Sequence, residues 1–338
     1  MALKKLTIVG GGLAGLALGI ALCRRSIPVQ LLEASAYPRH RVCGEFLSGI
    51  HSEELVGLGI EDLFVDAARS RETIWFDGPR AILRATLPEA AYGLSRFQLD
   101  SALAQRFIAL GGQLRTGVRA GDDPAEGTVH ASGRPQRDSP WIGLKAHFGE
   151  FPLSADLEIH LADGGYVGVT RVEEGRVNVS GLFRRKTPLN GGPRMFTQAV
   201  AEAGLGQLAE RLESAQMDRA SLKGVSRFHL GWQIQRGAAV CIGDAAALIP
   251  PFTGNGMTMA LQSALLAVEP LAQWSQGECG WESVGRAIRK AQSGMFSTRL
   301  RWAHAMQKVL FQPLGRRICA ALIARQWISF ETFYRKLR

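Results

Sequence analysis

The chain has 338 residues, of which 46% are apolar and 21% charged, and its formal net charge is +10. This size and balance exclude a miniprotein and a disordered chain, and they fit a globular enzyme or binding protein with one large or two domain-sized units. The charge is local, because residues 285–338 hold 12 Lys or Arg and one acidic residue, which leaves the rest nearly neutral.

The N-terminal segment reads as a strand, a glycine-rich turn, a helix and a second strand. Residues 6–9 form an apolar run suited to a buried parallel strand, residues 13–25 have helical apolar spacing, and residues 29–32 form the second strand. Five glycines between residues 10 and 19 argue against a secretory signal. No other segment offers roughly 18 uninterrupted apolar residues, so we expect no membrane-spanning helix and a cytoplasmic protein.

The turn carries the spacing GxGxxG, which is typical of dinucleotide binding when it links a strand to a helix. The three glycines permit a tight turn, a close approach of the backbone to a pyrophosphate, and close packing of helix on strand. The acidic residue that ends the second strand can accept both hydroxyls of an adenosine ribose. The sequence therefore predicts an NAD or FAD site, and its first residues are Gly10, Gly12, Leu13, Ala14, Gly15 and Glu33.

The next segment, YPRHRVCGEFLSG at residues 37–49, places Cys43 between a basic run and Gly-Glu. By itself this cysteine could be a nucleophile, a metal ligand, a cofactor neighbour or a packing residue. The five cysteines lie far apart, without CxxC and without a histidine at ligand spacing, so we predict neither a metal site nor a disulfide.

Residues 71–90 and 141–225 alternate apolar and polar positions, which predicts the strands of a separate sheet. These stretches are ETIWF, AILRATL, IGLKAHF, DLEIHL, YVGVTRV and RVNVSGLF. They flank the segment at residues 93–117, so the second sheet is inserted between pieces of the nucleotide-binding domain.

Residues 238–267 show the same order of elements as the N-terminus, a strand followed by a glycine-containing loop and a helix. The apolar strand is followed by Gly-Asp, a proline-rich loop, and Gly-Asn-Gly-Met at the start of the helix. This stretch resembles the Gly-Asp motif of flavoproteins in the p-hydroxybenzoate hydroxylase superfamily. The resemblance implies that FAD is the cofactor and that Asp244 binds its ribityl chain. The N-terminus of the following helix would stabilise negative charge on a reduced flavin ring.

Two further segments bear on this resemblance. The helix at residues 93–117 fits the family's Arg-x-x-Leu/Phe-Asp-x-x-Leu pattern, whose arginine contacts FAD, whereas Ser132-Gly133 replaces the family's Asp-Gly motif. The remaining cofactor-binding residues expected from the motifs are Arg41, Cys43, Gly44, Arg96, Gly243, Asp244, Pro251, Gly254, Gly256 and Met257.

The segment around Cys43 resembles PRxKxCGGxxS of the geranylgeranyl reductase-like branch, with Glu45 in place of the second glycine. This places Cys43 beside the flavin and makes it the candidate catalytic residue. A fainter resemblance at residues 164–181 keeps Tyr166 and Asn178 but lacks the branch's Trp and Pro, and a plain β-hairpin explains most of it. With His147, these two residues are the predicted substrate-pocket residues.

The predicted fold is α/β: a Rossmann-type FAD-binding domain, glutathione reductase-like and of the p-hydroxybenzoate hydroxylase type, with an inserted β-sheet substrate domain and a C-terminal helical segment. Residues 1–70, 91–140 and 226–284 form the first domain, 71–90 and 141–225 the second, and 285–338 the basic segment.

The predicted function is an FAD-dependent oxidoreductase that transfers hydride from reduced flavin to a C=C bond of a lipophilic, polyketide- or isoprenoid-like compound. The alternative is an aromatic monooxygenase that uses NAD(P)H and O2 through a flavin C4a-hydroperoxide. NAD(P)H would bind transiently, since there is no second GxGxxG unit. A redox sensor without turnover is a third reading, and halogenation is not expected, because the halogenase Trp-x-Trp-x-Ile-Pro block is absent.

Residues 285–338 look helical and amphipathic, with aromatic residues among the basic ones. One reading is contact with an anionic membrane surface or an acidic carrier protein, which would make the protein peripheral to the membrane. The other is a helical layer packed on the domain, with a solvated basic face. No motif supports nucleic-acid binding.

Overall fold

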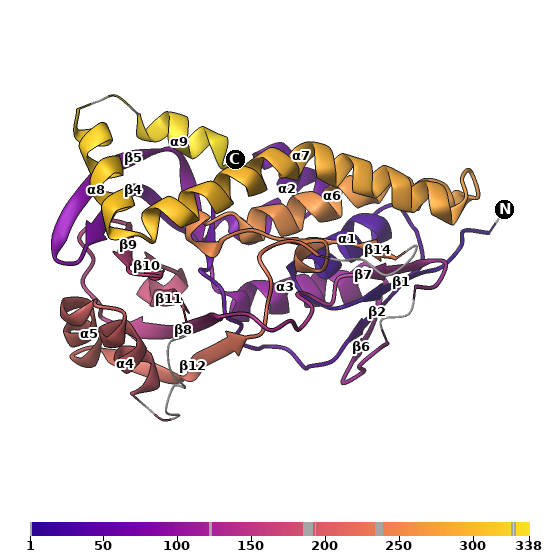
Figure 1. Ribbon diagram of the computed structural model, residues 1–338. Helices are drawn as coiled ribbons and strands as arrows, with labels where there is room; N and C mark the ends of the chain where they lie inside the picture. The colour runs from indigo at the N-terminus through magenta and orange to yellow at the C-terminus, as the bar shows by residue number, and fades with distance from the viewer. Residues whose placement is uncertain are drawn as a thin grey trace.

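The computed structural model describes residues 2–121, 124–184, 192, 194–233, 239–325, 327 and 329–338. Figure 1 shows two sheet-based halves, with the long helix α7 running across the top of the molecule. Each half has its own hydrophobic core.

The first half is built on a five-stranded parallel sheet in the order β14-β7-β1-β2-β6. Its strands are β1 (Leu6–Val9), β2 (Val29–Glu33), β6 (Gln113–Thr116), β7 (Thr128–His130) and β14 (Val240–Cys241). Helix α1 (Leu13–Cys23) connects β1 to β2, so the predicted strand–helix–strand unit is confirmed. It ends two residues earlier than the sequence pattern indicates.

Helix α1 is apolar on all sides, and residues 13–22 are all buried. This is expected of a helix enclosed by other elements, because it has no face for solvent. Helices α3 (Arg96–Ala109) and α6 (Gly256–Gln276) pack against it. A Cβ on Gly19 would lie 2.8 Å from the ring of Phe107, so this glycine permits the close crossing of α1 and α3.

The second half is built on an eight-stranded sheet in the order β12-β8-β11-β10-β9-β4-β5-β3. All neighbouring strands are antiparallel except β4 and β9, which are parallel. The strands are β3 (Phe46–Leu47), β4 (Ala68–Asp77), β5 (Arg80–Gly93), β8 (Trp141–Gly149), β9 (Leu157–Ala162), β10 (Gly165–Arg171), β11 (Val177–Arg184) and β12 (Gln216–Ser226). The six strands predicted from alternation are all present, and β3 adds a piece of the N-terminal segment to this sheet.

The two faces of this sheet are covered by different helices. On one face, β8, β10 and β11 pack against α4 (Met195–Glu202) and α5 (Gly206–Glu213). On the other face, β4, β9 and β10 pack against residues of the C-terminal segment. Figure 1 shows α4 and α5 on the opposite side of the sheet from α8 and α9.

The C-terminal segment forms α7 (Trp281–Leu310), α8 (Pro313–Ala324) and α9 (Phe330–Lys336). Helix α7 lies along α6, and α8 and α9 then cross the second half (Figure 1). Arg316 of α8 holds them there, because its guanidinium pairs with Asp77 and Asp163 at 2.7 Å each. The predicted helical C-terminal segment is therefore confirmed.

The remaining elements are short. They are α2 (Ser52–Leu58), the 3-10 turns Glu61–Phe64, Glu173–Gly175, Gly243–Ala245 and Pro251–Thr253, and a two-stranded ribbon of β13 (Gly231–Trp232) and β15 (Ala247–Leu248). Across the described ranges, no helix combines the length and the apolar character that crossing a membrane requires.

Candidate active site

A cavity of about 430 Å³ lies at the carboxyl ends of β1 and β2, between the two halves of the molecule. In open α/β sheets this edge is where dinucleotides bind. The cavity is lined by 15 of the 16 residues predicted to bind the cofactor: Gly10, Gly12, Leu13, Ala14, Glu33, Arg41, Cys43, Gly44, Arg96, Gly243, Asp244, Pro251, Gly254, Gly256 and Met257. We call it the cofactor cavity, and the individual contacts to FAD stay predictions.

The remaining predicted residue, Gly15, lies behind the turn, where its role is packing. A Cβ on Gly15 would lie 2.0 Å from the carbonyl oxygen of Gly10. Gly10 itself has φ +108, and a Cβ there would lie 2.3 Å from the carbonyl oxygen of Ala131. Gly12 faces the open cavity. The turn can therefore approach a ligand only because all three positions lack a side chain.

Glu33 is a buried carboxylate at the end of β2. Its Oε2 accepts a hydrogen bond from the Gly11 amide at 2.7 Å and its Oε1 accepts one from the Ser35 amide at 2.9 Å. Arg39 pairs with it at 2.8 Å. Burial by itself would raise the pKa of Glu33, but Arg39 and the two amides lower it overall, so the carboxylate is ionised. This is the charge state that a ribose-binding acceptor needs.

Four arginines line the cofactor cavity and supply positive charge around it: Arg41, Arg96, Arg119 and Arg134. Arg96 binds Asp100 through two hydrogen bonds of 2.6 and 2.7 Å, and Arg134 lies 3.7 Å from Asp244. Arg41 has a buried Nε that lies 3.5 Å from Asp100 Oδ2 but makes no hydrogen bond, so it can still donate to a phosphate. These groups fit a pyrophosphate.

Asp244 follows β14 in a 3-10 turn and is about one-third exposed to the cavity. Burial raises the pKa of Asp244, whereas the charges of Arg134, Arg96 and Arg41 counteract it. Gly243 precedes it with φ +62, and the Gly243 amide donates to Ser263 Oγ at 2.8 Å. The motif thus holds its carboxyl group at the cavity wall, as a ribityl ligand requires.

Helix α6 begins at the cofactor cavity with an open N-terminus. Its N-cap residue, Asn255, makes no side-chain capping hydrogen bond. The helix dipole and the unpaired amides of the first turn therefore favour negative charge at this wall. Gly256 and Met257 line the cavity there, as the sequence pattern predicts.

Side chains of the second sheet hold the segment that carries Cys43 and Gly44. Asn178 Nδ2 donates to the carbonyl oxygens of Cys43 and Gly44 at 3.1 and 2.8 Å. Glu45 has φ +52, and its carboxylate contacts His147 Nε2 at 2.5 Å and Lys145 Nζ at 3.2 Å. The side chains of Glu45, Lys145, His147 and Asn178 are buried, and that of Cys43 is partly buried.

His147 and Asn178 were predicted as substrate-pocket residues, and that role stays a prediction for both. They face each other in the register of β8 and β11, and they bind the segment at residues 43–45. Neither lines the apolar cavity described below. Strand alternation shows which residues share a face, but it does not show which segment will cover that face.

Cys43 lines the cofactor cavity as a protonated thiol. Burial raises the pKa of Cys43, and its Sγ accepts a hydrogen bond from the Glu45 amide at 3.4 Å. A thiol in this state is a poor nucleophile and can donate a proton. Within the described residues, no disulfide joins two cysteines and no cluster of potential metal ligands exists.

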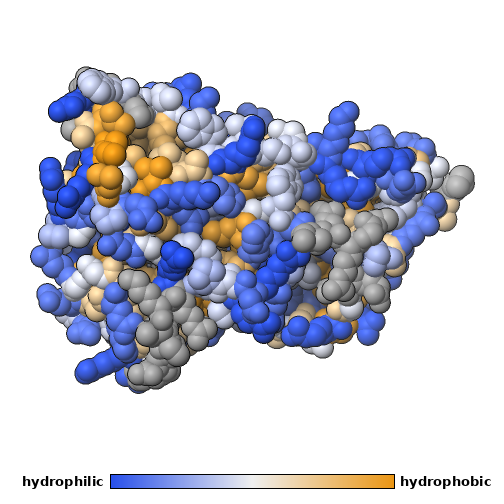
Figure 2. Space-filling model, in the orientation of Figure 1, coloured by the Kyte–Doolittle hydropathy of each residue, from blue (hydrophilic) through white to orange (hydrophobic). Residues whose placement is uncertain are grey.

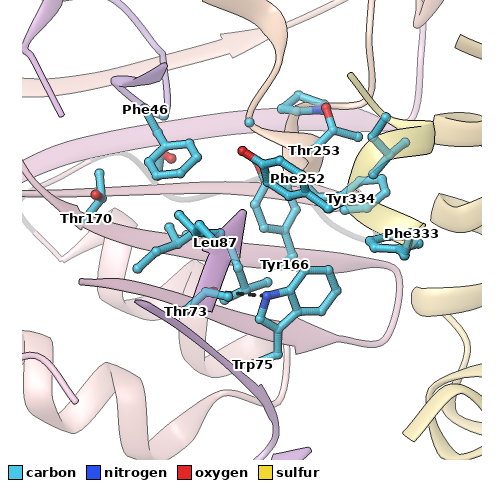
Figure 3. Close-up of a pocket in the computed structure, with 18 of the residues that line it drawn as sticks. Phe46, Thr73, Trp75, Leu87, Tyr166, Thr170, Phe252, Thr253, Phe333 and Tyr334 are labelled. Carbon is cyan, nitrogen blue, oxygen red and sulfur yellow. Dashed lines mark hydrogen bonds between the residues drawn. The ribbon is translucent and has the colours of Figure 1, made fainter. Parts of the chain in front are cut away.

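An apolar cavity of about 60 Å³ adjoins the cofactor cavity. The two share four wall residues: Gly44, Phe46, Pro251 and Gly254. Figure 3 shows Tyr166, Trp75 and Phe252 at this space, with Phe333 and Tyr334 of α9 beside them. Tyr166 is the one predicted pocket residue that lies here, and burial raises its pKa, so its hydroxyl is protonated.

The sequence patterns did not indicate that α9 lines this cavity. Phe330, Phe333 and Tyr334 lie at helical i, i+3 and i+4 spacing, which is the signal that one face is turned inward. Residues 118–120 and 131–134 also line the cofactor cavity without having been predicted, and the altered Ser132-Gly133 pair lies among them.

Comparison with known proteins agrees with this geometry. Residues 152–286 match the family model described as FAD binding domain. No curated protein matches the sequence significantly. Given this match and the cofactor cavity, FAD is the cofactor and the chain is an FAD-dependent oxidoreductase.

Solved structures share the fold along nearly the whole chain. FqzB is 18% identical with a TM-score of 0.76, over 99% of this chain and 90% of that one. p-Nitrophenol 4-monooxygenase PnpA from Pseudomonas putida DLL-E4 is 14% identical with a TM-score of 0.75, over 100% and 97%. The myxobacterial chondrochloren halogenase CndH is 16% identical with a TM-score of 0.73, over 97% and 90%. These likenesses establish the fold, and they do not single out the geranylgeranyl reductase-like branch.

Proposed function

We propose that this protein is an FAD-dependent monooxygenase that hydroxylates a lipophilic aromatic compound. The observation that carries the proposal is the shared wall between the apolar cavity and the cofactor cavity. An aromatic ring in the apolar cavity would lie against the cofactor and be screened from water. PnpA, a monooxygenase by its name, has the same fold and supports this reading.

When bound, FAD would take two electrons from NAD(P)H and use O2 to insert one oxygen atom, releasing the other as water. The residues of this chain would orient and isolate the reactants. The open N-terminus of α6 favours the negative charge of a reduced ring. The aromatic walls exclude solvent, and the protonated hydroxyl of Tyr166 can donate a hydrogen bond to a polar group of the substrate.

Hydride transfer to a C=C bond is the second candidate. It is favoured by one observation: the protonated Cys43 thiol lies in the wall of the cofactor cavity, where it could protonate a reduced product. The resemblance of the surrounding segment to the geranylgeranyl reductase-like branch also supports it. A polyketide- or isoprenoid-like substrate belongs to this proposal.

The two candidates differ in what they do with oxygen. The holoenzyme would be given NADPH and a panel of alkylated phenols and aryl acids under 18O2, and products would be analysed by mass spectrometry. We expect incorporation of one labelled oxygen atom per NADPH oxidised. Products that have gained two hydrogen atoms, formed equally well without oxygen, would contradict hydroxylation and support hydride transfer.

A further part of the proposal concerns the C-terminal segment, residues 285–338. Its exposed residues support peripheral contact of a cytoplasmic protein with an anionic membrane surface. Leu314, Ile318 and Trp327 are 69%, 50% and 71% exposed, and Figure 2 shows hydrophobic residues gathered where α8 lies. Arg317 and Arg325 are exposed as well. The other aromatic residues of the C-terminal segment are mostly turned inward, toward the apolar cavity and its neighbours.

Liposome sedimentation tests this contact. Replacing both Leu314 and Ile318 by Gln should release the protein from vesicles that contain anionic lipid, and the variant should keep its bound flavin. Unchanged binding, or binding only to an acidic carrier protein, would contradict it.

A further inference from the structure

A second hollow, of about 640 Å³, opens beside the apolar cavity. The two share Leu87, Phe330, Tyr334 and Arg338, so a molecule held in the apolar cavity could extend directly into this space. We call it the vestibule. The wall of the vestibule is more polar than that of the apolar cavity, because Arg299 and Gln262 also line the vestibule.

Two guanidinium groups in the vestibule lack an acidic partner. Arg299 of α7 is 6% exposed, and its Nη1 donates to Gln262 Oε1 at 2.9 Å. Arg338 stacks 4.1 Å from the centre of the Tyr334 ring, and its Nη1 donates to the Thr253 carbonyl oxygen at 3.1 Å. The Nε atoms of both arginines are buried without a hydrogen bond. No carboxylate in the described part of the chain lies within ion-pair distance of either.

The two positive charges also disfavour each other. Burial, and then the charge of Arg338, lower the pKa of Arg299 to about 10, and burial lowers the pKa of Arg338. The nearby carboxylates offset this only in part. The charge of Glu54 raises the pKa of Arg299, but Glu54 accepts a hydrogen bond from Gln262. The charge of Glu89 raises the pKa of Arg338, and Glu331 pairs with Arg335. Glu89 is exposed at the edge of the vestibule. An anion between the two arginines would satisfy donors that are otherwise unpaired and would offset their repulsion.

We propose that the vestibule binds a carboxylate of the substrate, whose apolar part occupies the apolar cavity. The substrate class is therefore an aromatic or lipophilic carboxylic acid. This inference rests on the proposed function for the direction in which the substrate lies, with its reacting part toward the cofactor and its acid group away from it. The sites for binding and for oxygen insertion are then separate, so each can be tested alone.

The test compares two probes that differ only in charge. Binding of 4-phenylbutanoate and 4-phenylbutanamide to the FAD-loaded enzyme would be measured by calorimetry, without NADPH, so that no turnover is involved. We expect the acid to bind about tenfold or more tightly than the amide, as one charge-assisted contact predicts. The preference should disappear in Arg299→Met and in Arg338→Met.

Each variant has a nearby control: Arg301 lies on α7 with Arg299, and Lys336 ends α9 two residues before Arg338. Arg301→Met and Lys336→Met remove exposed positive charges and should keep the preference for the acid. Equal binding of acid and amide to the unaltered enzyme would overturn the proposal even if a variant failed to fold. Survival of the preference in both Arg299→Met and Arg338→Met would overturn it too. If the enzyme prefers the acid but inserts no oxygen into any substrate, the monooxygenase proposal is refuted and the vestibule proposal is not.

Discussion

The carboxylate of Glu45 and the imidazole of His147 meet at 2.5 Å in a place that solvent does not reach. The same carboxylate lies 3.2 Å from Lys145 Nζ and accepts a hydrogen bond from the Arg96 amide at 3.0 Å. One side chain thus ties the segment beside the cofactor cavity to the second sheet and to the start of α3.

Glu45→Gln should strongly destabilise the protein, because it leaves the buried charge of Lys145 without its counter-charge. Breaking one partner of a buried ion pair costs about 3–5 kcal/mol. Urea unfolding of the FAD-loaded protein measures the loss. Glu150→Gln is the control, since Glu150 also has a positive φ of +48 but is exposed. Adding Lys145→Met to Glu45→Gln should recover part of the stability; a double variant as unstable as the single one would contradict the ion-pair argument.

Gly15→Ala should abolish FAD binding, because the new methyl group would overlap the Gly10 carbonyl oxygen, 2.0 Å from its position. The turn would have to shift away from the pyrophosphate position. Flavin absorbance of the purified protein measures the effect. Gly294→Ala in α7 is the matched control, since a Cβ there meets nothing within 4 Å. It should retain flavin and gain up to about 1 kcal/mol of stability. Normal flavin content in Gly15→Ala would refute the packing role.

Glu158 should make stability depend on pH in the acid range. Burial by itself would raise the pKa of Glu158, but hydrogen bonds from His160, Arg211 and the Ser154 amide lower it to about 2. A carboxyl group with a lowered folded-state pKa stabilises the fold above its unfolded value, near 4.5, and this contribution is lost as pH falls toward 2.

Glu158→Gln should therefore lower the free energy of unfolding at pH 7 by something on the order of 3 kcal/mol. The difference from the unaltered protein should shrink below pH 4.5 and vanish near pH 2. Denaturant unfolding across this range measures it, with the exposed Glu213→Gln as control. A difference that is constant with pH would mean that packing, and not ionisation, is responsible.

Arg316→Met should loosen the C-terminal helices from the second sheet. It removes the pairs with Asp77 and Asp163 and the bonds to the Ala162 and Leu310 carbonyl oxygens. We expect faster proteolysis within α8 and α9 and weaker substrate binding with unchanged FAD content. The neighbouring Arg317→Met removes an exposed arginine and should change neither. Identical proteolysis of the two variants would show that Arg316 does not anchor the segment.

The parts of the fold that could be predicted from the sequence are those fixed by local pattern. The GxGxxG turn and its flanking strands depend on residues within one strand–helix–strand unit, so their spacing carries the information. The alternating stretches likewise give the strands of the second sheet. The lining of the cofactor cavity could be predicted from these motifs, because strand ends and glycine turns form its wall.

The rest depends on contacts between distant segments, which spacing does not encode. His147 and Asn178 have the alternation of pocket residues, but the segment at 43–45 covers them. Tyr334 and Arg338 enter the site because α8 is anchored to β4 and β9 and directs α9 across the sheet. A basic segment with scattered aromatics gives no indication of this path.

The two cavities draw on different stretches of the chain, and this sets an order of assembly. The lining of the cofactor cavity comes from residues up to Ala260, whereas that of the apolar cavity includes residues of α9 and Arg338, which follows it. During synthesis on the ribosome, the flavin-binding half can emerge and fold before α9 has been translated. FAD can therefore load into an open site, and the apolar cavity closes only when α9 has emerged.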